Sequence, residues 1–202
     1  MADKHATPDH PIHDLIASRW SPYVFADRPV SDADLCSMLE AARWAASSYN
    51  EQPSSYIVAK REHADEFQRL LSCLVELNQA WAKAAAVLAL GVVRLRFTRN
   101  DQPNRAAVHD LGLASANLVV EATSRGLAVH QMIGIVPEKA REVYAIPEAF
   151  EAWTGLAIGY RGDPTTAPDT RRARDTSPRQ RKPLSDFVFT GHWGSPSPIV
   201  SR

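Results

Sequence analysis

Residues 104–125, with the sequence NRAAVHDLGLASANLVVEATSR, decide the fold of this chain. Ala, Leu and Val recur so densely that they cover nearly every face of the helix that this stretch predicts. A helix that is apolar all round is buried, either at the centre of a protein or at a subunit interface. In a chain of 202 residues, a buried helix of this length suggests an obligate dimer. Gly126 then ends the helix as its C′ glycine.

Shorter elements are predicted on both sides of this helix. Strands are expected at residues 54–59, 86–95, 127–135, 153–160 and 187–189. The other helices are expected over a short stripe ending near 18, after an N-cap at 31, and at 62–77 and 137–144. The N-cap is Ser31, with Asp34 three residues later. This mixture is an α+β or α/β pattern, and it leaves the connectivity of the sheet open.

Composition and charge limit the classes of function. The 23 basic and 23 acidic side chains balance, so the chain as a whole has no field that would attract nucleic acid or a membrane surface. The longest apolar run, residues 84–93, is too short to span a bilayer. Residues 171–182 carry six basic side chains and one Asp, a block typical of a solvated tail that can also bind phosphate.

The two cysteines and the N-terminus indicate a cytoplasmic protein. Cys36 and Cys73 both lie inside helical patterns, which argues against a disulfide framework and fits a reducing compartment. Residues 1–9 are polar and lack the apolar core of a signal peptide, and we expect them to be disordered.

Residues 47–53, SSYNEQP, allow two interpretations. Ser and Asn leave helices because their side chains compete for backbone hydrogen bonds, so the stretch can be a helix stop and a turn. It can also be a polar loop that lines a cofactor pocket, since ligand contacts favour loops held by rigid elements.

The sequence contains no recognisable nucleotide-binding or nucleophile motif. The chain has no GxxxxGK[ST], GxGxxG or GxSxG motif, and neither Cys has a nearby His. His10, His13 and Asp14 have metal-ligating side chains but no second cluster, so no metal site is expected. A redox cofactor would then most economically supply the chemistry.

Five segments, in this order along the chain, resemble the FMN-dependent nitroreductase family. They are RWS at 19–21, AARWAASSYNEQP at 41–53, DLGLASANL at 110–118, MIG at 132–134 and RQRKPL at 179–184. The resemblance covers roughly residues 10–194. It implies an α+β, nitroreductase-like fold with a central, mostly antiparallel sheet flanked by helices. It also implies an intertwined homodimer with C-terminal strand exchange. A single domain at 10–194 would then include an arm, 161–194, that lies over the partner subunit, with a tail at 195–202.

The resemblance also assigns residues that bind FMN at the dimer interface. The assigned residues are Arg19, Trp20, Ser21, Tyr23, Ser47, Ser48, Asn50, Gln52, Asn78, Met132, Ile133, Gly134, Arg179 and Arg181. Arg19, Arg179 and Arg181 match residues that contact the phosphate end of FMN. Ser47, Ser48 and Asn50 match a loop that reaches FMN from the other subunit.

The chain departs from the family pattern at three places. Tyr23 stands where a second basic residue is frequent, and Trp81 stands where a Lys is frequent near the flavin, with Lys83 close by. Met132 and Ile133 replace a segment that carries Glu in relatives. These differences bear on substrate and nicotinamide preference more than on flavin binding.

The implied activity is a ping-pong reaction in which NAD(P)H reduces FMN and a small oxidant, such as a nitroaromatic or a quinone, is then reduced. No protein side chain is assigned as catalytic, because flavin N5 carries the chemistry. Two alternatives stay open. One is an FMN protein with another redox task, such as flavin fragmentation or dehalogenation. The other is a non-enzymatic dimer that binds an acidic partner through residues 171–182.

Overall fold

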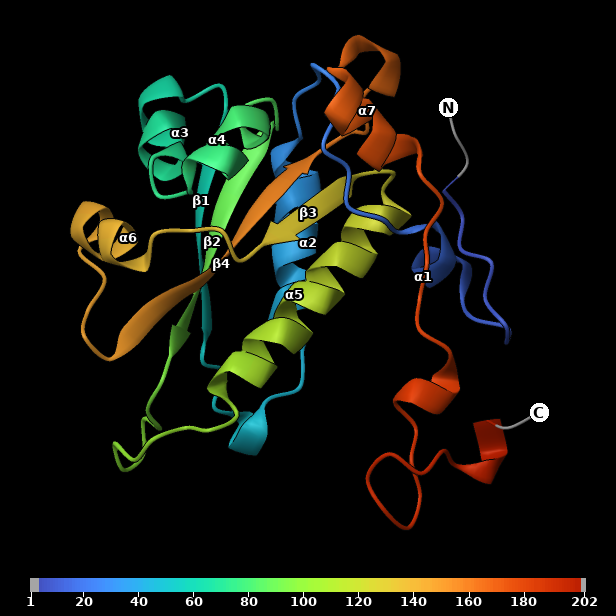
Figure 1. Ribbon diagram of the computed structural model, residues 1–202. Helices are drawn as coiled ribbons and strands as arrows, with labels where there is room; N and C mark the ends of the chain where they lie inside the picture. The colour runs from blue at the N-terminus through green and yellow to red at the C-terminus, as the bar shows by residue number, and fades with distance from the viewer. Residues whose placement is uncertain (1–3, 201–202) are drawn as a thin grey trace.

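The computed structural model describes residues 4–200 and has three layers, with one antiparallel sheet between two layers of helices (Figure 1). The sheet order is β1-β2-β4-β3, and every neighbouring pair is antiparallel. The strands are β1 (Ser54–Lys60), β2 (Val87–Arg94), β3 (Ala128–Met132) and β4 (Phe150–Gly159). The expected α+β fold with an antiparallel sheet is therefore confirmed.

One face of the sheet packs against α2 (Asp32–Arg43) and α5 (Ala107–Ser124). Met38 of α2 and Leu118 of α5 are fully buried there, against Val87 of β2 and Leu156 and Ile158 of β4. α2 begins where predicted, because Ser31 Oγ accepts the N–H of Asp34 at 3.0 Å.

The opposite face packs against α3 (Ala64–Leu71), α4 (Glu76–Ala82) and α6 (Pro137–Tyr144). Phe67 and Leu70 of α3 meet Leu88 and Leu90 of β2, which alternate with the β2 residues that face α2 and α5. β2 is buried on both faces, which explains why its sequence is an unbroken apolar run.

The single helix predicted at 62–77 is wrong. Residues 72–75 separate α3 from α4 because they pair with the chain beyond β3: Val75 N–H donates to Gly134 O at 3.1 Å, and Cys73 O accepts from Val136 N at 2.7 Å. Leu77, expected on the buried face, is 84% exposed. This break positions Asn78 opposite residue 134.

Most sides of α5 are buried within this chain, and the expected burial of the remaining side at a subunit interface stays a prediction. One stripe is exposed in this chain, and it consists of Gly112, Leu113, Ala116, Asn117 and Val120. The spacing of three and four residues places these side chains on one face of the helix. Gly126 ends α5 as expected, with φ +72° and its N–H bonded to Thr123 O.

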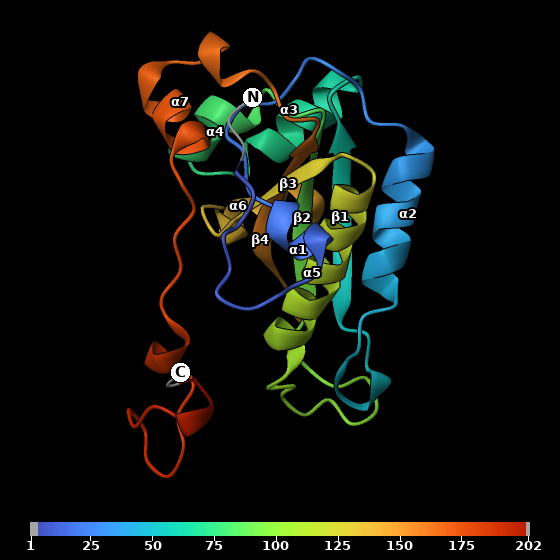
Figure 2. The ribbon, with the colours of Figure 1, turned by 90° about the vertical axis from the view of Figure 1, so that its right-hand side faces the viewer.

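The C-terminal arm leaves the three layers after α7 (Asp169–Thr176), as Figure 2 shows. Residues 187–189 do not form the predicted strand. The arm has short 3₁₀ turns, η3 (Leu184–Asp186) and η4 (Pro198–Val200), and one isolated bridge between Phe189 and Pro196. A short segment with no neighbouring strand has no ladder of hydrogen bonds to hold it extended.

The described N-terminal residues precede α1 (Asp14–Ser18) and form no helix or strand. Ala6 N–H nevertheless bonds to Ala17 O at 2.9 Å, and Lys4 Nζ bonds to Arg174 O at 2.8 Å. Positions 1–3 of the segment expected to be disordered lie outside the described residues. Within residues 4–200, no helix has both the length and the hydropathy of a membrane-spanning helix.

Candidate functional site

Four arginines from three separate stretches of the chain gather around the segment 18–25, which itself carries one of them, Arg19. Arg19 follows α1, Arg161 follows β4, and Arg179 and Arg181 follow α7. Arg19 Nη1 donates to Ser21 Oγ at 3.3 Å, and Arg161 Nη2 donates to Ser18 O at 3.0 Å. Arg179 Nη1 donates to the carbonyl of Ala17. In the described part of the chain, none of the four forms an ion pair with a carboxylate. We call these four residues the basic cluster.

The basic cluster concentrates positive charge in a partly buried place. Burial lowers the pKa of Arg19, and the nearby guanidinium groups of Arg179, Arg181 and Arg161 lower this pKa further. Burial, Arg181 and Arg161 lower the pKa of Arg179 in the same way. A guanidinium group stays protonated in proteins, so deprotonation does not relieve this repulsion. A bound anion does relieve it. Planar forks of N–H donors match phosphate oxygens, so the cluster can bind a phosphate group.

A buried carboxylate fixes the arm to the segment that carries Arg19. Asp175 of α7 is 2% exposed, and it accepts the N–H of Tyr23 at 2.9 Å and the N–H of Val24 at 2.9 Å. These bonds join positions more than 150 residues apart. Since α7 leads directly to Arg179 and Arg181, the hydrogen bonds of Asp175 bring these two arginines close to Arg19.

Asn78 and Gly134 meet although 56 residues separate them. Asn78 Nδ2 donates to Gly134 O at 3.0 Å, and Trp81 Nε1 donates to Asn78 Oδ1 at 3.2 Å. A Cβ at position 134 would lie 2.3 Å from Asn78 Nδ2, so the contact needs glycine. Ile133 is 82% exposed, whereas the side chain of Met132 is buried in the core.

Tyr23 and Trp81 pack against His130. The ring centroids of Trp81 and His130 are 4.4 Å apart, and Tyr23 lies 5.0 Å from Trp81 and 4.6 Å from His130. His130 Nδ1 lies 2.9 Å from Pro22 O, and since a carbonyl only accepts, Nδ1 carries the proton. Burial lowers the pKa of His130. Trp81, which stands where the resemblance led us to expect a Lys, is a buried core residue.

The loop at 47–52 stores backbone strain. Tyr49, Asn50 and Gln52 have φ of 55°, 55° and 51°, a region that non-glycine residues rarely adopt. The loop is held by Ser48 N–H, which donates to the buried carboxylate of Asp110 at 3.0 Å, and by Gln52 N–H, which donates to Ser47 Oγ. Strain of this kind persists where the surroundings hold it and is typical of functional loops.

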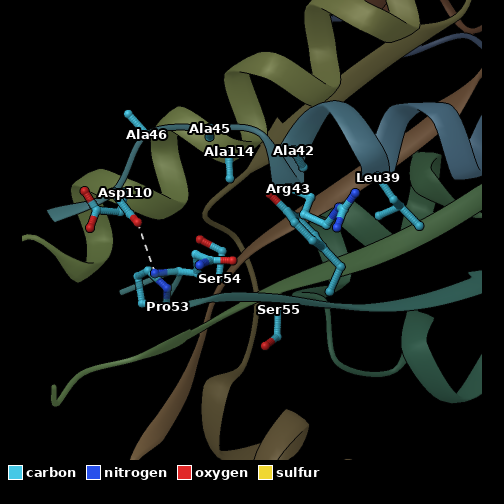
Figure 3. Close-up of a pocket in the computed structure, with 13 residues that line it drawn as sticks. Leu39, Ala42, Arg43, Ala45, Ala46, Pro53, Ser54, Ser55, Asp110 and Ala114 are labelled. Carbon is cyan, nitrogen blue, oxygen red and sulfur yellow. Dashed lines mark hydrogen bonds between the residues drawn. The ribbon is translucent and has the colours of Figure 1, made fainter. Parts of the chain in front are cut away.

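A cavity of about 310 Å³ lies behind this loop, between α2, β1 and α5 (Figure 3). Asp110 and Ala114 of α5 line one side, and Pro53 and Ser54 line another. Of the residues assigned to FMN, only Ser47 and Gln52 belong to its lining. Because no arginine of the basic cluster lines it, this cavity is not the candidate phosphate site.

The structure thus brings some assigned residues together and keeps others apart. Arg19, Ser21, Arg179 and Arg181 gather near α1 and α7, whereas η1 (Ser48–Asn50) lies at the other end, near the start of α5 (Figure 1). Asn78 and Gly134 form a third group between α4 and β3.

Sequence reasoning missed Arg161, Asp175 and His130. The position of Arg161 directly after a strand was the only local signal available for it. Asp175 was the single acid in a basic run, which marks it as unusual without naming its partner. Arg171, Arg172 and Arg174, interpreted as solvated, form surface hydrogen bonds to Ala80 O, Asp169 and Tyr23 Oη.

The fold is α+β, and the basic cluster gives this chain a place that can bind a phosphate group. The chain belongs to the nitroreductase family, whose model matches residues 16–160. A 15.4 kDa protein of Mycolicibacterium smegmatis, described as uncharacterized, is 34% identical over 147 residues, which are 70% of this chain and 98% of that protein. The major NAD(P)H-flavin oxidoreductase of Aliivibrio fischeri is 37% identical over 98 residues, which are 46% of this chain and 43% of that protein.

A solved structure extends the similarity to the whole fold. The crystal structure of an oxidoreductase containing FMN has a TM-score of 0.88 to this chain, at 32% identity over 94% of this chain and 96% of the other. These similarities support an oxidoreductase with a flavin cofactor. The donors of the basic cluster fit that cofactor, because FMN ends in a phosphate and the cluster offers guanidinium groups with no carboxylate paired to them in the described residues.

Proposed function

We propose that this protein is a homodimeric oxidoreductase that uses NAD(P)H to reduce FMN and then reduces a nitroaromatic, a quinone or a similar small oxidant in ping-pong order. The observation that carries the proposal is the basic cluster. Arg19 and Arg179 lie 160 residues apart in the sequence, and both were expected at the phosphate end of FMN. They lie close enough in the structure that Arg179 lowers the pKa of Arg19, and Arg161 and Arg181 lower the pKa of both.

The residues of this chain would hold the cofactor from two sides. Arg19, Ser21, Arg179 and Arg181 would bind the phosphate and the ribityl chain. Asn78 and the backbone at Gly134 would lie along the ring, because their mutual hydrogen bond already fixes that edge. FMN, when bound, supplies hydride transfer at N5, which no side chain here can perform.

The homodimer is supported by two apolar surfaces. The exposed stripe on α5 includes Leu113 and Val120, and apolar residues in such a stripe are typical of a subunit interface. The C-terminal arm exposes Phe187, Trp193 and Ile199, and it projects from the three layers (Figure 2). An arm of this kind fits a partner subunit.

The position of the loop at 47–52 supports the same assembly. Its residues lie near the start of α5, whereas the basic cluster lies beside α1 and α7 (Figure 1). In a dimer built across α5, the loop of one subunit would approach the basic cluster of the other. Ser47, Ser48 and Asn50 would then complete the partner's FMN site.

The absorption spectrum of the purified protein and FMN titration test flavin binding first. Steady-state oxidation of NADH and of NADPH, each with and without a nitroaromatic or a quinone, then tests the reaction. We expect a yellow protein whose double-reciprocal plots are parallel, as ping-pong order requires. A colourless protein that does not take up FMN, or NAD(P)H oxidation that no oxidant stimulates, contradicts the proposal.

A further inference from the structure

Arg161 holds both ends of the segment that presents Arg19 and Ser21. Its backbone forms an antiparallel bridge with Phe25, and the next residue, Gly162, donates its N–H to Val24 O at 2.9 Å. Its side chain reaches back to the other end of the segment, where Nη2 donates to Ser18 O at 3.0 Å. Arg161, which follows β4, therefore contacts both ends of residues 18–25.

The contact between these two stretches is tight. A Cβ at Gly162 would lie 2.7 Å from the carbonyl carbon of Phe25, so only glycine lets the backbones approach this closely. The Arg161 guanidinium also lies 5.3 Å from the ring centroid of Trp20, between Arg19 and Ser21 in the sequence. The guanidinium thus touches the segment in its middle as well as at its start.

The guanidinium of Arg161 lacks an anionic partner and one hydrogen-bond acceptor among the described residues. Arg161 Nε is buried and has no hydrogen-bond partner among the described residues. No carboxylate in that part of the chain forms an ion pair with Arg161. An unpaired buried donor costs free energy, so its presence calls for a reason beyond packing.

The neighbouring charges supply a reason. Arg161 acts on both Arg19 and Arg179, since its guanidinium contributes to the lowered pKa of each. It therefore lies within electrostatic range of the two arginines expected to contact phosphate, and it adds a further positive charge to theirs. The three charges come from three elements that only the fold brings together.

We propose that Arg161 is a positioning residue of the phosphate end of the flavin site, and that its charge makes the protein prefer FMN over riboflavin. This inference rests on the proposed function. Arg161 fixes the Arg19–Ser21 turn through Ser18 O and Trp20, and its charge attracts the phosphate that distinguishes the two flavins.

The test measures the dissociation constants of FMN and riboflavin with flavin-free protein, by quenching of flavin fluorescence. Arg161→Gln removes the charge but keeps a hydrogen-bond donor, and Arg161→Lys keeps the charge. We expect Arg161→Gln to reduce the preference for FMN over riboflavin by about tenfold or more, with a smaller change in riboflavin affinity. Arg161→Lys should keep most of the preference.

Arg28→Gln is the matched control. Arg28 lies 3.6 Å from the ring centroid of Tyr160, the residue before Arg161, but within residues 4–200 it does not contribute to the lowered pKa of Arg19, Arg161 or Arg179. It should leave the preference for FMN unchanged. Urea unfolding of each variant shows whether the fold is retained.

The outcomes separate this inference from the proposed function. If wild-type protein binds neither flavin, both fail. If wild type prefers FMN and Arg161→Gln retains that preference, or loses affinity for both flavins equally, the role of Arg161 is overturned and the proposed function stands.

Discussion

The basic cluster and the loop at 47–52 are both expected to bind FMN, but they differ in exposure and in backbone strain. The basic cluster is tied by long-range bonds, because Asp175 and Arg161 join the C-terminal half to residues 18–25. The loop is held by Asp110, by two hydrogen bonds from Thr98 to Glu51 and by bonds among its own residues, and its polar residues Asn50 and Gln52 are exposed.

This difference teaches which part of the site one chain can build alone. The basic cluster, which we propose binds the phosphate, is organised within one chain, whereas the loop presents strained, exposed polar residues far from the cluster. The strain and exposure make sense when the loop serves another subunit. Four predictions test this contrast, beginning with the largest expected effect.

Removal of the Asp175 carboxylate should destabilise the chain most. Asp175→Ala leaves the N–H groups of Tyr23 and Val24 buried without an acceptor, at about 1–3 kcal/mol for each group. Urea unfolding should therefore show a loss of roughly 2–6 kcal/mol for the two groups together. Asp169→Ala is the control on the same helix, because Asp169 pairs at the surface with Arg172. A loss no larger than that of the control would show that Asp175 does not organise the cluster.

Removal of a guanidinium from the phosphate end should weaken FMN binding next. A hydrogen bond to a charged group contributes about 1.5–3 kcal/mol, so Arg19→Ala and Arg181→Ala should each raise the FMN dissociation constant roughly 10- to 150-fold. Arg172→Ala on α7 is the control and should bind FMN as wild type does. Unchanged FMN affinity in both cluster variants would mean that phosphate binds elsewhere.

Relief of strain in the loop should have a moderate effect on stability. Gln52 has φ 51°, a conformation that costs an L-residue about 1 kcal/mol and glycine almost nothing. Gln52→Gly should therefore be more stable to urea than Gln52→Ala by about 1 kcal/mol. Equal stability of the two variants would show that the loop relaxes in solution and is not held in this conformation.

Lowering the pH should have the smallest effect on the unfolding free energy. Burial places the pKa of folded His130 below its exposed value of 6.5, so the unfolded state binds more protons as pH falls through this value. The unfolding free energy should therefore decrease between about pH 7.5 and pH 5. His130→Gln keeps a donor for Pro22 O but does not titrate, so its pH profile should be flatter. Identical profiles would assign the acid sensitivity to other groups.

Local signals predicted much of the fold. The helix cap at Ser31, the stop at Gly126 and the apolar run of β2 depend on neighbouring residues, and each was recognisable in the sequence. The break between α3 and α4 was not, because it arises from pairing with residues 134–136, some 60 positions away. The strand expected at 187–189 failed for a related reason, since strands need neighbours and the arm has none in this chain.

The site was predictable to the same extent. Arg19, Ser21, Arg179 and Arg181 were assigned through resemblance to the family, and the structure places them together, while their contact with FMN stays a prediction. Arg161 and Asp175 were missed because their roles depend on contacts across more than 140 residues. No local pattern encodes such contacts.

The central claim is that each FMN site needs the basic cluster of one subunit and the loop of the other. Mixed dimers of two tagged chains test it, one chain with Arg19→Ala and Arg179→Ala, the other with Ser48→Ala and Asn50→Ala. Purified mixed dimers would contain one site with both defects and one intact site. We expect FMN to bind the mixed dimers with wild-type affinity at half the wild-type stoichiometry, and to bind each variant homodimer weakly. Weak binding at every site of the mixed dimer would contradict it.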